Sequence, residues 1–176
     1  AGNDATKTLW AVGSSLSLSQ SKVIVDGVVP TISGVTSSTA DGMYTVGDSI
    51  SISVAFSESV DVVTTGGTPT LELETGSTNR TATYSSGSGS STLVFTYTVQ
   101  AGDTASDLDY SSTSALSLNS GTIKDSAGHN ATLTLPTVGG SSSLAGSSAL
   151  VIDTTSPSAP TSLTTTATTT SNTTPT

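Results

Sequence analysis

Cysteine is absent from the 176-residue sequence, so neither a disulfide framework nor a cysteine-based metal site can form. Basic residues are also scarce, with four Lys and Arg against 13 Asp and Glu, and the formal net charge is −9. Because nucleic acids and anionic membranes attract basic surfaces, this balance argues against both as partners. Apolar runs are short of the roughly 20 residues that span a membrane, so we expect no membrane insertion.

No arrangement of residues that is typical of catalysis stands out in the sequence either. The sole histidine, His129, lies in a predicted glycine-containing turn, where a positioned general base is not expected. Glu72 and Glu74 are two residues apart on a predicted strand, so they share one solvated face and do not flank a substrate. No glycine-rich nucleotide-binding motif is present. We therefore predict that the protein is not an enzyme.

What the sequence does contain is a long internal repeat. AGNDATKTLWAVG at 1–13 matches AGHNATLTLPTVG at 127–139 at eight of 13 positions, and KVIVDGVVP at 22–30 aligns with ALVIDTTSP at 149–157. A period of 126–127 residues is the size of a whole domain. We predict the C-terminal part of a preceding repeat at 1–26 and a complete module at 27–153. Residues 154–176 are either a Thr/Ser/Pro-rich linker or the start of the next repeat.

Within the complete module the dominant hydrophobic period is two. Ile50, Ile52, Val54 and Phe56, for example, alternate with small polar residues, as in a strand with one face toward a core. Gly, Asp and Ser clusters separate such runs, which favours an all-β, immunoglobulin-like antiparallel β-sandwich. The predicted strands are 31–36, 49–57, 60–64, 69–74, 80–85, 92–100, 110–118, 131–135 and 148–153. Tyr110 is predicted to place its ring in the core and its hydroxyl on backbone.

Several motifs resemble the bacterial immunoglobulin-like repeats of very large surface and secreted proteins. They are YTVGDSISISVAFSESVDV, GTPTLELETG, FTYTVQAGDTASDLDY, GTIKDSAGHNATLTL and VIDTTSP. The resemblance implies a tandem module in an adhesin-type stalk or surface filament, outside a bacterial cell and often stiffened by calcium. The sequence departs from the family pattern at His129, where Asn is usual, and at the first junction, which lacks the usual Thr.

The acidic residues give a prediction that depends on topology. If successive strands run back and forth, Asp26, Glu58, Asp61 and Asp125 converge on the end where the chain enters the module. Ca²⁺ binds six to eight oxygens from carboxylates, carbonyls and water, so these residues form a candidate calcium site at a junction between modules.

A second acidic group is predicted at the opposite end. It contains Asp103, Asp107, Asp109 and Asp153, and by the repeat Asp153 corresponds to Asp26. The spacing from Asp103 to Asp109 is not that of an EF-hand loop. For both groups an ordinary alternative remains, because Asp in turns normally caps its own backbone and scattered acids confer solubility.

Two functional hypotheses follow. In the first, the chain is a structural spacer that contacts neighbouring modules of its own chain or identical chains in a filament. In the second, it is a carbohydrate- or protein-binding module. The low aromatic content of 4% favours the spacer, because aromatic side chains usually line such binding sites. Residues 1–26 could also donate a strand to another chain by β-augmentation.

Overall fold

The structure is a computed structural model, and it describes residues 26–159. The predicted strand donation by residues 1–26 and most of the segment 154–176 therefore lie outside the described residues. The described part contains strands and one short helix, with the following bounds. They are β1 (Ile32–Ser37), β2 (Gly42–Tyr44), β3 (Ser49–Val63), β4 (Thr70–Glu74), β5 (Arg80–Ser86), β6 (Ser90–Thr98), β7 (Thr104–Ala105), β8 (Asp109–Tyr110), β9 (Leu116–Ser117), β10 (Thr122–Lys124), α1 (Leu144–Ser147) and β11 (Leu150–Asp153).

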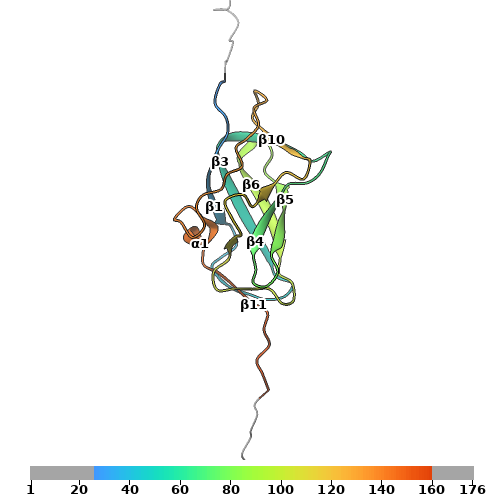
Figure 1. Cartoon of the computed structure of the whole chain (residues 1–176), viewed down its shortest axis with the longest axis vertical. Helices are drawn as coiled ribbons and strands as arrows, with labels where there is room; N and C mark the ends of the chain where they lie inside the picture. Colours follow the sequence, from blue (N-terminus) through green and yellow to red (C-terminus); the bar gives the residue numbers. More distant parts are fainter. Residues whose placement is uncertain (1–25, 160–176) are drawn as a thin grey trace, which may run out of the picture.

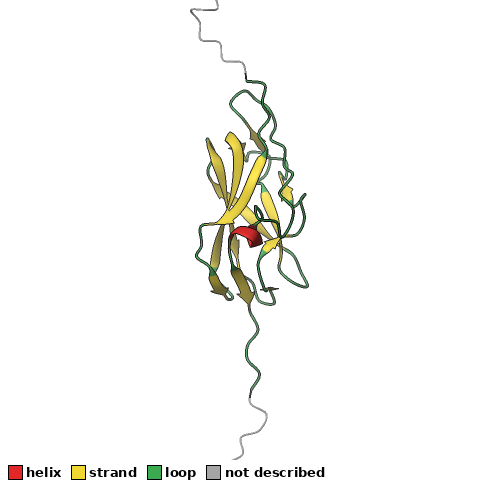
Figure 2. Cartoon of the chain, turned by 90° about the vertical axis from the view of Figure 1, so that its left-hand side faces the viewer, coloured by secondary structure: helices red, strands yellow, loops and turns green. Residues whose placement is uncertain are grey.

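The strands form two sheets, so the all-β class predicted from the sequence is confirmed (Figure 2). The larger, curled sheet has the order β1-β3-β6-β5-β4-β8, with β10 added to β3 and β9 added to β4. The smaller sheet has the order β2-β11-β7. Strand pairs are antiparallel except for β2 and β11, which run parallel. This arrangement is consistent with a β-sandwich.

The hydrophobic core follows from the two-residue period of the longest strands. In β3 the inward residues Ile50, Ile52 and Val54 are fully buried, and their neighbours Ser51 and Ser53 lie on the outer face. The same alternation buries the apolar residues of β6, β4 and β11. Each fully buried Ile, Leu or Phe contributes about 1.5–3 kcal/mol of transfer free energy, so this inner layer dominates the stability.

The structure corrects three strand predictions. The segments 49–57 and 60–64 form one strand, β3, with a bulge between Ala55 and Val60 where a turn was expected. The predicted strand 110–118 is interrupted between β8 and β9, because Ala115 N–H donates to Ser112 O in a local turn. Residues 131–135 form only isolated contacts and no strand, since their N–H groups donate to three separate segments. The short helix α1 was not expected from the sequence.

Tyr110 takes the position predicted for it. Its ring is fully buried, and its hydroxyl donates to Pro136 O at 2.7 Å. Burial raises the pKa of Tyr110 to about 12, so the phenol stays protonated at neutral pH. The hydroxyl therefore ties β8 to the irregular segment that leads toward α1.

The chain enters the module at one end and leaves it at the opposite end (Figures 1 and 2). We call these the entry end, around Asp26–Thr31, and the exit end, around Asp153. At the entry end Ser57 N–H donates to Thr31 O at 2.8 Å, and Thr132 N–H donates to Pro30 O at 2.8 Å. Within residues 26–159, none of the helical structure is long and apolar enough to cross a membrane.

Candidate metal centre at the entry end

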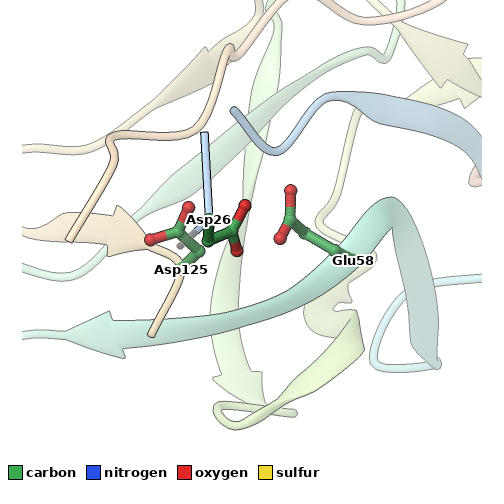
Figure 3. Close-up of side chains that lie close together, drawn as sticks. All are labelled: Asp26, Glu58 and Asp125. Carbon is green, nitrogen blue, oxygen red and sulfur yellow. The ribbon is translucent and has the colours of Figure 1, made fainter. Parts of the chain in front are cut away.

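Three carboxylates meet at the entry end. Asp26, Glu58 and Asp125 each offer an oxygen that lies within 4.8 Å of the others (Figure 3). They come from three separate parts of the chain: the segment before β1, the bulge of β3 and the turn after β10. The structure thus brings together three of the four residues that topology predicted there.

Local hydrogen bonds position two of these side chains. Asp26 Oδ1 accepts from Val28 N–H at 3.0 Å, which is an Asx turn. Asp125 Oδ1 accepts from His129 N–H at 2.8 Å, and Asp125 Oδ2 lies 2.7 Å from His129 Nδ1. The turn between them needs Gly128, whose φ of 95° lies in the left-handed region. His129 therefore contacts both carboxylate oxygens of Asp125.

Glu58 is placed differently, at the next inward position of β3 after Phe56. Its Oε1 is buried and has no hydrogen-bond partner in the described part of the chain. Burial raises the pKa of Glu58, and the negative charges of Asp26 and Asp125 raise it further. A buried carboxylate oxygen without a donor is costly, so this position favours either a proton or a cation.

His129 counters part of the negative charge. Its hydrogen bond to Asp125 raises the pKa of the imidazole, and the charges of Asp26 and Glu58 add to this effect. For Asp125, burial alone would raise the pKa, but the hydrogen bonds from His129 outweigh burial and lower it. From the sequence, His129 was expected only to be a turn residue. Its spacing of four residues from Asp125 was the signal that could have indicated the pairing.

The ligand atoms available here are all oxygens. Oxygen ligands suit hard cations such as Ca²⁺, which also takes backbone carbonyls and water into its coordination shell. His129 would act as an outer partner that orients Asp125, as hydrogen-bonded groups commonly do for metal-ligating carboxylates. The arrangement can therefore hold a hard divalent cation between the incoming chain and the body of the module.

The fourth predicted residue, Asp61, does not join this group. The strand continues past Glu58, and Asp61 pairs in register with Lys124 on β10. Its side chain is exposed. The prediction assumed a tight turn after 57, and the continuation of β3 carries Asp61 beyond the cluster.

The acidic residues predicted to gather at the exit end each accept hydrogen bonds from their own partners within the protein. Asp103, which is 1% exposed, accepts from Arg80 Nε at 2.7 Å, from the Tyr97 hydroxyl at 2.6 Å and from Gln100 N–H at 2.8 Å. Burial alone would raise the pKa of Asp103, but these hydrogen bonds outweigh burial and lower it. This carboxylate is satisfied by the protein itself.

Asp109 is buried in the same manner. It accepts from the backbone N–H groups of Tyr110 at 2.9 Å, Gly139 at 2.9 Å and Leu144 at 3.2 Å. One carboxylate thus fixes β8, the 139 turn and the start of α1. Its role is structural, and the contacts leave it facing the interior of the fold.

Asp107 and Asp153 complete the set. Asp107 Oδ1 accepts from Leu150 N–H at 3.4 Å, and Asp153 Oδ1 accepts from Thr155 N–H at 2.9 Å. Among residues 26–159, Asp26, Glu58 and Asp125 at the entry end are the one group of carboxylates whose oxygens lie within 4.8 Å of one another. The structure therefore does not gather Asp103, Asp107, Asp109 and Asp153 into a second cluster.

The surface also carries a hollow of about 340 Å³ beside β7 and β11, lined mainly by small and hydroxyl-bearing side chains.

Comparisons with protein-family models, with curated proteins and with solved structures find no match for this chain.

Proposed function

We propose that the chain is an immunoglobulin-like structural module of a tandem-repeat protein on a bacterial surface or in a surface filament, where it acts as a spacer. One observation carries the proposal. The chain enters and leaves at opposite ends of the module, and the sequence before it, 1–26, matches the last part of the module itself. A module built this way extends the chain by its own length each time it is repeated.

The two junctions support this proposal because they share local geometry. Asp26 accepts from the N–H two residues later, at 3.0 Å, and Asp153 accepts from the N–H two residues later, at 2.9 Å. Each Asp precedes a proline by four positions, Pro30 and Pro157. The same Asx turn thus occurs before and after the module, as expected for equivalent junctions.

We further propose that the entry end holds Ca²⁺. Asp26 corresponds by the repeat to Asp153, the last residue of β11, so it belongs to the end of the preceding repeat. Glu58 and Asp125 belong to the body of the module. An ion bound by all three would connect two successive modules and reduce bending between them.

The alternative of a binding module receives less support. All six aromatic residues in the described part of the chain are buried or partly buried, so they form no exposed platform. The hollow beside β7 and β11 has no aromatic lining. Sugar-binding sites typically use such rings, and the described surface is instead rich in Ser and Thr.

Thermal unfolding in CaCl₂ and in chelator tests the calcium proposal. A ligand that binds only the folded state at 100 times its Kd adds about 2.7 kcal/mol, so we expect the melting temperature to fall by several degrees in chelator. Glu58→Gln should abolish this dependence, because it removes one of the three ligands. Asp61→Asn is the matched control and should retain it.

Equal melting temperatures with calcium and with chelator would remove the ion from the proposal. The spacer itself is tested separately, by small-angle scattering of the full chain and of two chains fused in tandem. The maximum dimension should increase by about one module length per copy. A fused pair that folds back on itself would contradict an extended spacer.

A further inference from the structure

The exit strand β11 is the central strand of the small sheet. It runs parallel to β2 on one side and antiparallel to β7 on the other. β2 follows β1 along the chain, and both run from the entry end toward the exit end. The strand that continues from the entering chain therefore lies directly beside the strand that leaves.

This pairing has a mechanical consequence. Tension at the entry end first loads β1, which pairs with β3, and it reaches β2 once β1 has been pulled away. β2 is then drawn toward the entry end and β11 toward the exit end, so the two strands slide along each other. The hydrogen bonds of a parallel pair are evenly spaced and slanted between the strands, so sliding loads the register pairs Gly42–Leu150, Met43–Val151 and Tyr44–Ile152 together. Peeling would break such bonds one at a time. We propose that β2, β11 and β7 form a load-bearing clamp that resists unfolding when the module is stretched.

Side chains extend the clamp beyond the ladder. Asp41 Oδ1 accepts from Ala149 N–H at 2.8 Å, and Gly42 N–H donates to Ala149 O at 3.0 Å. On the β7 side Leu108 N–H donates to Leu150 O at 2.8 Å. The residue before β11 and its first residue are thus held from both sides.

The other end of β11 is fastened as well. The Thr154 hydroxyl accepts from Gly102 N–H at 3.1 Å and donates to Asp103 O at 2.8 Å. Within the strand, Leu150 and Ile152 point into the core and are almost fully buried. The first residue after the strand is therefore tied to the turn that carries the buried Asp103.

The biological meaning of this clamp rests on the proposed spacer function, but its test does not. The chain lacks cysteine, so a cysteine added at each terminus attaches pulling handles at unique positions. Single-molecule force spectroscopy then measures the unfolding rate at constant force, which the unfolding barrier governs.

Asp41→Ala and Thr154→Val should each raise the unfolding rate under force about tenfold, because each removes at least one hydrogen bond that holds β11. Asp48→Ala is the matched control. Asp48 lies at the same end and accepts from Thr45 N–H at 2.8 Å, and neither residue belongs to β2, β11 or β7. The unfolding rate of Asp48→Ala under force should remain close to that of the wild type.

Equilibrium unfolding in urea accompanies each variant, so that a general loss of stability is separated from a weaker clamp. If Asp48→Ala accelerates forced unfolding as much as the other two variants, the clamp is wrong. A wild-type module that extends at low force without a resolved unfolding event also overturns it. Either result leaves the scattering test of the spacer, and the calcium test, unaffected.

Discussion

At the entry end, Asp26, Glu58 and Asp125 place three carboxylates together, and one Glu58 oxygen is buried without a partner among the described residues. At the exit end, Asp103 accepts three hydrogen bonds, and Asp107 and Asp153 each accept a backbone N–H. The entry end gathers negative charges in one place, whereas at the exit end each carboxylate is satisfied by its own hydrogen-bond donors. The comparison shows that the acidic residues at the two ends of this fold are arranged in two ways, and that hydrogen-bond satisfaction distinguishes them.

The largest expected effect comes from removing the carboxylate of Asp103, which is satisfied by hydrogen bonds at the exit end. Asp103→Ala leaves the buried Tyr97 hydroxyl and the Arg80 guanidinium without their shared acceptor. Removing one partner of a buried ion pair typically costs about 3–5 kcal/mol, so the free energy of unfolding in urea should fall by about that amount. A loss below about 1 kcal/mol would mean that the exit end does not depend on this carboxylate.

The second prediction concerns pH, measured in chelator so that no cation occupies the entry end. The pKa of Glu58 is raised, so its ionisation costs stability at neutral pH, and acidification relieves that cost. The pKa of His129 is also raised, so its contribution is present below about pH 6.5 and is lost as pH rises through the folded-state pKa. The melting temperature should therefore rise as pH falls from about 8 to about 5.

Below about pH 4 the exit end should reverse this trend. The pKa of Asp103 is lowered, so its contribution is present above the ordinary Asp value and is lost as pH falls through the folded-state pKa. His129→Asn should reduce the rise between about pH 8 and about pH 5, and it should leave the part of the acid limb that Asp103 contributes. An identical profile in wild type and His129→Asn would show that His129 does not contribute to the rise.

The smallest expected effect separates the two equivalent junction residues. Asp26→Asn should remove the calcium dependence of the melting temperature, because Asp26 lies with Glu58 and Asp125. Asp153→Asn should leave that dependence unchanged and shift the melting temperature very little. Asp153 is bonded to Thr155 and has no other acidic side chain in a cluster within the described residues. Equal effects of both substitutions would contradict the assignment of the ion to the entry end.

The sequence predicted the strands that follow a clean two-residue alternation, such as 49–57 and 80–85. It failed for 131–135, where the pattern is apolar and alternating but the backbone bonds to several different segments. Single-sequence periodicity reports burial, and it does not report which partner a backbone group finds. The short helix α1 has too few residues to show a helical period.

The candidate site could be predicted in part for a similar reason. Alternating strand directions were enough to bring Asp26, Glu58 and Asp125 to one end of the module. They did not reveal the continuation of β3 that carries Asp61 beyond the group, nor the side-chain and backbone donors that satisfy Asp103 and Asp109. Those features depend on side-chain and turn geometry, which a count of strand reversals does not contain.

Glu58 occupies an inward position on the same strand as Ile50, Ile52 and Val54. The residue that faces the incoming chain therefore lies in line with the buried apolar side chains of this strand. In a tandem array, the attachment of one repeat and the folding of the next would share a free energy term, as in a one-dimensional cooperative system. Unfolding of either repeat would then remove ligands from the site that the two share, so each repeat would stabilise the other.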